Sequence, residues 1–367
     1  MTLEDLALIF TRGIGSRGAR HLVDYFGSAE ALFAASRSEI VEGAGLRAEL
    51  VDALLDSRNL ELARREAEYC RRNNILAIAA TDAEYPEALR DTADRPHVLF
   101  VKGNIEALGG NLLAMVGTRE SSPAGQHACN TIVEGLAKSV DELRIVSGLA
   151  YGIDAAAHRA ALNCDVPTVA VVATTLPDVS PAAHRNLAED ILRRGGALVS
   201  ELHSQTHHNG SMFIARNRII AGLCHGTLVV ESPARGGSLA TADIADSYGR
   251  VVMALPGRIS DPASFGTNGL IRSGKARLVL SAADIIEDLG WNISLGVATD
   301  AEVEDKTAGL SAAERNLYAA FDTAATLDWP SLMEATGLTM GELAMVVMDL
   351  EMKGLIRTLP GKRYERV

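Results

Sequence analysis

The amino-acid sequence predicts an α/β fold, in which a doubly wound, mostly parallel sheet is flanked by a smaller domain at each end of the chain. Residues 76–290 alternate strand-like and helix-like segments, as expected for a sheet covered by helices on both faces. An apolar strand, a turn of small residues and a helix start recur in 113–119, 145–158 and 228–243. Apolar residues make up 47% of the sequence, enough for a large core.

Length, charge and cysteine use narrow the class of protein. A chain of 367 residues suits two or three domains. The net charge of −12 argues against a broad basic face, so any contact with nucleic acid must use a local pocket of arginines. No segment is long and apolar enough for a membrane span or resembles a signal peptide, and the cysteines are spaced singly, so we expect a cytoplasmic protein without disulfides.

Residues 1–75 are predicted to form a small all-helical domain of the SAM or helix-hairpin-helix type. Proline is absent, and a helix is expected over 16–26 after the glycine turn at 13–15. Such a turn can offer amides to a DNA phosphate. A plain packing turn is the favoured alternative, because the arginines around it are balanced by nearby acids.

The central domain, residues 76–290, is expected to hold the functional site. Its strand-like segments are 76–80, 98–101, 112–116, 144–147, 168–173, 197–200, 227–231 and 251–255. The turns that follow parallel strands gather at the carboxyl edge of the sheet, where ligands bind. Glycines let the backbone approach a ligand closely, and free N–H groups at helix starts attract anions. The sequence therefore predicts a site for the phosphate of a nucleotide or a polynucleotide.

The remaining residues are predicted to form a linker and a winged-helix domain. Residues 291–310 are small, polar and acidic, which indicates a flexible linker. Helices at 311–321, 330–336 and 339–353, followed by two short strands, give residues 311–367 a winged helix-turn-helix pattern. The third helix is acidic, so we favour a protein contact or a structural role over DNA reading.

Three turns carry the candidate phosphate ligands. Arginine can clamp a pair of phosphate oxygens, while hydroxyls and amides complete the shell. Two further arginines, at 216 and 218, are expected either to hold phosphate or to pair with Glu201 or Glu231. Asp154 is expected to cap a helix or bind a ligand hydroxyl, and His158 to be a packed histidine. The candidate ligands are Gly117, Thr118, Arg119, Ser121, Ser122, Ser147, Gly148, Gly152, Arg216, Asn217, Arg218, Gly237 and Ser238.

The sequence lacks the motifs that are typical of several kinds of catalysis. The sequence has no P-loop, no dinucleotide glycine pattern after the relevant strands, and no evident acid pair or Ser–His–Asp set. The histidines at 203, 207 and 208 fit an exposed loop better than a metal site. We therefore expect no catalytic residue, no metal and no cofactor, and we favour a binding protein over an enzyme.

Many markers, in order along nearly the whole chain, resemble the DprA/Smf family, the DNA-processing proteins of bacterial transformation. These markers are Tyr85-Pro86 with Leu89, Arg95-Pro96, 99–103, 116–119, 147–154 with His158, 200–201, 216–223, 236–242, 249–250 and 255–257.

The resemblance implies both a fold and a function. The central domain would be an extended Rossmann-like fold that binds single-stranded DNA without sequence preference and without nucleotide hydrolysis. The family protects incoming strands, loads the RecA recombinase onto them, and forms homodimers through the Rossmann domain. Its phosphate-contacting arginine falls on Arg119, and its other site segments fall on 147–152 and 216–218.

One stretch departs from the family. Where members carry Tyr-Pro and a nearby DNA-contacting lysine, this chain has Ser180-Pro181 and no lysine, and Arg185 is the candidate substitute for that lysine. Aromatic residues are only 4% of the chain, and the best-placed stacking candidates, Tyr151 and Phe213, both fit the core better.

Two other functions stay open. One is a Rossmann-like enzyme related to nucleoside-monophosphate phosphoribohydrolases, although Asp243 stands where that group needs a glutamate. The other is a sensor that binds a small nucleotide and signals through the tail domain.

Overall fold

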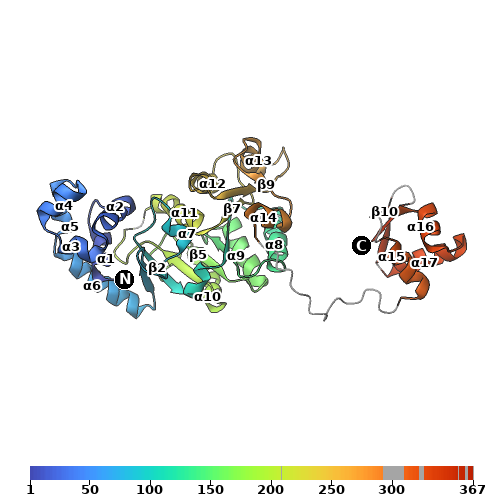
Figure 1. Cartoon of the computed structure of the whole chain (residues 1–367), viewed down its shortest axis with the longest axis horizontal. Helices are drawn as coiled ribbons and strands as arrows, with labels where there is room; N and C mark the ends of the chain where they lie inside the picture. The colour runs from blue at the N-terminus through green and yellow to red at the C-terminus, as the bar shows by residue number, and fades with distance from the viewer. Residues whose placement is uncertain (208, 292–309, 322–325, 354, 360–362, 367) are drawn as a thin grey trace. The chain divides into compact units, whose positions relative to one another are not determined.

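A computed structural model describes residues 1–207, 209–291, 310–321, 326–353, 355–359 and 363–366. The chain forms two compact units, Met1–Ser294 and Leu295–Val367 (Figure 1). Nearly all of the expected linker at 291–310 lies outside the described residues.

The first unit is built on a nine-stranded sheet with the order β1-β2-β6-β5-β4-β3-β7-β8-β9. Strands β3 to β9 run parallel, whereas β2 is antiparallel to both β1 and β6. The chain starts the parallel part at β3, builds outward to β6, and returns to place β7 on the other side of β3. The strands are β1 Leu76–Ala79, β2 Val98–Gly103, β3 Asn111–Val116, β4 Leu143–Ser147, β5 Thr168–Val171, β6 Ala197–Ser200, β7 Gly226–Val229, β8 Val251–Ala254 and β9 Arg277–Leu278.

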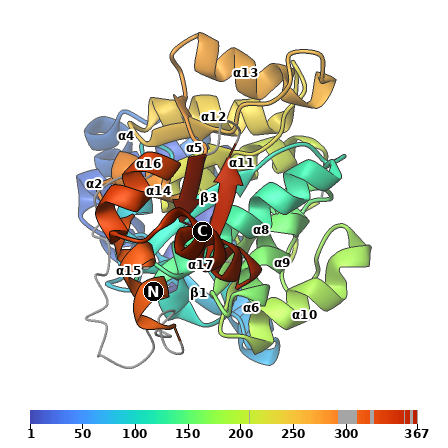
Figure 2. The ribbon, with the colours of Figure 1, turned by 90° about the vertical axis from the view of Figure 1, so that its right-hand side faces the viewer.

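Helices cover both faces of this sheet, as the alternation of strands and helices predicts. Along β3, Leu112 and Ala114 belong to the core shared with α11 and α12, while Leu113 and Met115 face α8 and α9. Figure 2 shows the ribbon of these helices around β3. Burial on both faces explains why central strands such as β3 are almost entirely apolar. The helices are α7 Glu87–Arg90, η1 Ile105–Leu108, α8 Pro123–Ala137, α9 Ile153–Asn163, η2 Ala182–His184, α10 Arg185–Arg193, α11 Ser211–Leu223, α12 Gly237–Ser247, η3 Pro262–Ser264, α13 Phe265–Arg272 and α14 Ala282–Leu289.

The N-terminal helices belong to the same compact unit as the sheet. Buried polar contacts join them to it: His97 Nε2 lies 3.0 Å from Asp5 Oδ1, and the Ser204 amide donates to Glu66 at 2.9 Å. Tyr69 also donates to the carbonyl of Leu176 at 2.8 Å. The helices are α1 Leu3–Phe10, α2 Ser16–Phe26, α3 Ala29–Ala34, α4 Arg37–Ala44, α5 Ala48–Leu54 and α6 Arg58–Arg72.

The second unit has the helices and hairpin of the predicted winged helix. Thr339 and Glu342 form a capping box at the start of the third helix, as the capping threonine suggests. A third strand, β10, pairs with β12 and was not expected, because three residues are too few to show a periodicity. The elements are α15 Ala312–Ala320, β10 Thr326–Asp328, α16 Trp329–Thr336, α17 Met340–Met352, β11 Ile356–Leu359 and β12 Arg363–Arg366.

A candidate phosphate-binding cleft

A cleft of about 640 Å3 opens at the carboxyl ends of β3 and β7, where the sheet changes its direction of winding. The turns after β3, β4 and β7 contribute to its wall, and α11 forms another side. Its lining includes seven of the candidate ligands: Gly117, Thr118, Arg119, Arg216, Asn217, Gly237 and Ser238.

Arg119 is the candidate best placed to meet an anion. The turn before it is fixed, because the Thr118 amide donates to the Glu231 carbonyl at 2.8 Å. The Arg119 side chain is exposed, and its guanidinium carbon lies 5.7 Å from the centre of the Phe213 ring. Among the described residues, no carboxylate forms an ion pair with it.

The two serines after Arg119 are engaged elsewhere. Ser122 is the N-cap of α8: its hydroxyl accepts from the Gly125 amide at 3.0 Å and donates to Glu231. Ser121 Oγ accepts from Gln126 at 3.1 Å and lines a neighbouring hollow. The cleft lining includes neither serine.

The turn after β4 shapes the cleft through its backbone. Ser147 is fully buried and donates to the Met115 carbonyl at 2.6 Å, so its hydroxyl does not face a ligand. Gly152 has φ of 77°, and a Cβ there would lie 2.2 Å from the Thr118 carbonyl oxygen. Asp154 accepts from the amides of Gly148 and Ala150, so it fixes this turn.

Arg216 is buried and acts as an internal brace. Its guanidinium donates to the carbonyls of Gly148, at 2.7 Å, and Val171. A Cβ at Gly148 would lie 2.5 Å from that guanidinium, so a side chain there would displace Arg216. Burial, together with the nearby charge of Arg119, lowers the pKa of Arg216 to about 10, although the Asp154 carboxylate opposes this shift.

Arg218 pairs with an acid, which is one of the two expectations for it. Its guanidinium binds Glu201 and also donates to Ser16 Oγ at 3.2 Å, so it joins α11 to the N-terminal helices. Asn217 donates to the Gly237 carbonyl at 3.4 Å and so links α11 to α12.

The start of α12 adds free amides to the cleft. Gly236 is its N-cap and provides no side-chain hydrogen bond, so the first amides of the helix remain available to a ligand. The Ser238 side chain is buried against Ser232, at 3.0 Å, so Ser238 can offer its amide but not its hydroxyl.

Sequence reasoning missed Arg235, which lines the same cleft. This side chain is exposed, and none of the ion pairs or hydrogen bonds found among the described residues involves it. Arg235 lies in a glycine-containing turn after a strand, as Arg119 does, so the same sequence pattern could have identified it.

The structure also places the glycine turn, the two aromatic candidates and His158. Gly15, at the end of the glycine turn, and Ser16, at the start of α2, line a hollow with Glu201, whose carboxylate pairs with Arg218. Tyr151 is 51% exposed and Phe213 is half-buried, so the expectation that both belong to the core is wrong. His158 is buried, as expected for a packed histidine.

A doubly wound sheet with an arginine-lined, amide-rich cleft at its switch point defines a Rossmann-type α/β protein. The family model described as DNA recombination-mediator protein A matches residues 76–290, and the model of the DprA winged helix domain matches residues 301–362. The chain belongs to the DNA recombination-mediator protein A family, also called DprA/Smf.

Individual relatives agree with this assignment. Protein Smf of Escherichia coli K12 is 36% identical over 302 residues, which cover 78% of this chain and 76% of that protein. The solved structure of DNA processing protein A from Streptococcus pneumoniae superposes with a TM-score of 0.69 at 32% identity, over 78% of this chain and 98% of that one. DNA processing protein A from Helicobacter pylori, whose structure is described for its single-stranded DNA binding mode, gives a TM-score of 0.52 at 26% identity and covers 59% of this chain and 95% of that one.

Within the described residues, no cluster of three or more histidine, cysteine, aspartate or glutamate side chains is arranged to hold a metal ion. In the same part of the chain, no helix has the length and hydropathy needed to cross a membrane.

Proposed function

We propose that this protein binds single-stranded DNA in the cleft between the turns after β3, β4 and β7, without reading its sequence. Arg119 and Arg235 would hold successive phosphates, and the first amides of α12 would bind the backbone between them. The observation that carries the proposal is the pair of exposed arginines, each without a carboxylate partner among the described residues, at an uncapped helix start.

The chemistry of the cleft supports a polyanion over a base-reading role. Amides and guanidinium groups hold phosphate oxygens whatever the base. The Asp154 carboxylate also lines the cleft, but it is occupied by the amides of residues 148 and 150. The relative from Helicobacter pylori is described with a single-stranded DNA binding mode, which supports the same ligand here.

The direct test is a fluorescence anisotropy titration of labelled oligothymidylate at two salt concentrations. Arg119→Ala should weaken binding about tenfold, which is about 1.4 kcal/mol. The slope of log affinity against log salt should also become shallower, by about 0.7 for one lost phosphate contact. Arg235→Ala should behave in the same way.

Arg64→Ala is the matched control, because it removes the same charge from an exposed position on α6 that does not line the cleft. Its affinity and salt slope should equal those of the wild type. Unchanged binding by both cleft variants would refute the proposed site.

Within this proposal, the bound strand is protected and RecA recombinase is loaded onto it during transformation or recombination, by a homodimer formed through the Rossmann domain. RecA ATPase activity on strands coated with single-strand-binding protein should rise when this protein is added, and Arg119→Ala should not produce that rise. Sedimentation velocity should give the mass of a dimer for residues 1–291.

We propose a binding protein without catalytic activity. The alternative, a nucleoside-monophosphate hydrolase, predicts that free base is released when the protein is incubated with nucleoside monophosphates. Chromatography of that mixture distinguishes the two functions, since a binding protein leaves the nucleotide intact.

A further inference from the structure

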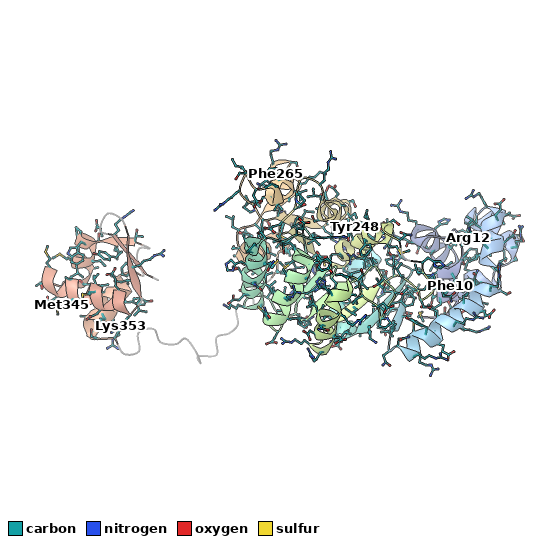
Figure 3. The ribbon with its side chains drawn as sticks, turned by 180° about the vertical axis from the view of Figure 1, so that it is seen from behind. Phe10, Arg12, Tyr248, Phe265, Met345 and Lys353 are labelled. Carbon is teal, nitrogen blue, oxygen red and sulfur yellow. The ribbon has the colours of Figure 1, made fainter. Side chains whose placement is uncertain are left out.

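Helix α17 of the second unit has a buried face and an exposed apolar face. Leu343, Val346, Val347 and Leu350 pack into the core of this unit. On the other side Met340, Met345 and Met348 are 65%, 68% and 60% exposed. Figure 3 labels Met345 at the surface of this unit (Figure 3).

The exposed apolar residues form a stripe along the helix. Positions 340, 344 and 348 are four apart and therefore lie in one row, with Met345 in the adjacent row. We call Met340, Ala344, Met345 and Met348 the methionine face. Soluble monomers seldom leave contiguous apolar surface exposed unless it serves an interaction.

Acidic residues accompany this face. Glu342, Asp349 and Glu351 are exposed on the same helix, and residues 340–352 contain no lysine or arginine. Lys353, which follows the helix, is paired with Glu314 at 2.6 Å. This pattern opposes the approach of DNA phosphates, although the third helix of a winged helix is the element that usually enters a groove.

We propose that the methionine face of α17 docks a basic amphipathic helix of a protein partner. Methionine side chains are flexible and polarizable, so they adapt to apolar side chains of varied shape. The exposed Asp349 carboxylate, which follows Met348 in the helix, would pair with a lysine or arginine that borders the apolar stripe of such a helix. A second copy of this face fits less well, because a symmetric pairing would bring the two sets of acids together.

The test uses the full-length protein with 13C-labelled methionine methyl groups, observed by NMR. The probe is a synthetic leucine–lysine peptide whose leucines occupy one face of a helix, and the control peptide has the same composition in shuffled order. The Met345 and Met348 methyl signals should shift saturably with the amphipathic peptide. The signals of Met115 and Met253, which are buried in the sheet, should stay in place.

Two variants separate the apolar contribution from the charge. Met345→Gln combined with Met348→Gln keeps side-chain size at exposed positions and should weaken peptide binding at least tenfold. Asp349→Asn should weaken it less and make the binding less sensitive to salt.

Three results would overturn the proposal. The first is equal shifts with the shuffled peptide. The second is shifts of the same methyl groups with duplex DNA but not with the amphipathic peptide. The third is shifts that depend on protein concentration without any peptide, which would identify a second copy as the occupant.

Discussion

The Phe213 ring contacts Arg119, whose guanidinium carbon lies 5.7 Å from the ring centre. An exposed cation–π contact is worth about 0.5–1 kcal/mol. Phe213→Leu should therefore weaken oligothymidylate binding about two- to fivefold, while Phe213→Tyr should retain the wild-type affinity. The salt slope should not change, because the number of phosphate contacts is the same. A loss well above tenfold would instead assign a base contact to the ring.

His158 gives the fold a pH dependence. The Thr168 hydroxyl donates to the Ile145 carbonyl at 2.6 Å, so His158 Nδ1, 2.8 Å from that hydroxyl oxygen, must carry the hydrogen. Its Nε2 is buried and has no hydrogen-bond partner within the described structure, which requires the neutral ring. Burial, with a smaller contribution from the charges of Arg216, His184 and Arg159, lowers the pKa of His158 to about 3.

The sign of the effect follows from the two states. Unfolded, the ring takes up a proton below its ordinary pKa of about 6.5, while the folded state does so only near 3. The free energy of unfolding should therefore fall by about 2 kcal/mol between pH 7 and pH 5 from this group alone. Urea titrations across this range should show that His158→Gln, which retains a donor to Thr168, lacks this part of the pH dependence. An identical pH dependence in the variant would contradict the assignment.

Arginines that look alike in the sequence have different partners in the folded protein. Arg216 and Arg218 lie two residues apart, yet one braces the carbonyls of residues 148 and 171 and the other pairs with Glu201. The partners of both arginines lie on segments that are distant in the sequence. The sequence could therefore predict Arg119 at the cleft, but it could not show which arginines bind internal partners and which remain free to bind a ligand. The same limit applies to Ser147, whose partner Met115 is on the neighbouring strand.

Among the elements, three strand-to-helix turns share one plan but differ in their helix starts. The first turn of α8 is capped by Ser122, whose hydroxyl donates to Glu231, whereas the first turn of α12 has no side-chain cap. The glycines and small residues predicted all three turns, and the apolar periodicity predicted the strands from β1 to β8 within a few residues of their observed bounds. The short strands β9 and β10 carry too few residues for such a signal.

The contact between α11 and the N-terminal helices depends on Arg218, whose guanidinium binds both Glu201 and Ser16. Arg218→Ala would leave the Glu201 carboxylate nearly buried without its cation, and the free energy of unfolding should fall by about 3 kcal/mol. Denaturant titration measures this loss. In the double variant with Glu201→Gln, much of the stability should return, because no unpaired charge remains. Equal stability of Arg218→Ala and the wild type would show that the pair contributes nothing.

At the scale of the whole molecule, the net charge of −12 makes the cleft a local exception on an acidic protein. Long-range attraction of DNA is therefore weak, and affinity depends on contacts within a Debye length of the cleft. All residues that line the cleft belong to the unit Met1–Ser294. Residues 311–367 carry six lysines and arginines against eight aspartates and glutamates, and helix α17 contains no basic side chain, so the second unit is not expected to strengthen DNA binding.

Removal of every residue after Trp291 tests this division of roles. The cut leaves the first unit's core intact, because Trp291 itself packs against it and stacks edge-on with His225 at 6.0 Å. The truncated protein should bind oligothymidylate within about twofold of the full chain and with the same salt slope, since it retains the same phosphate ligands. It should also lose all binding of the leucine–lysine peptide at the methionine face. A tenfold loss of DNA affinity on truncation would mean that the winged helix contacts the strand, despite its acidic third helix.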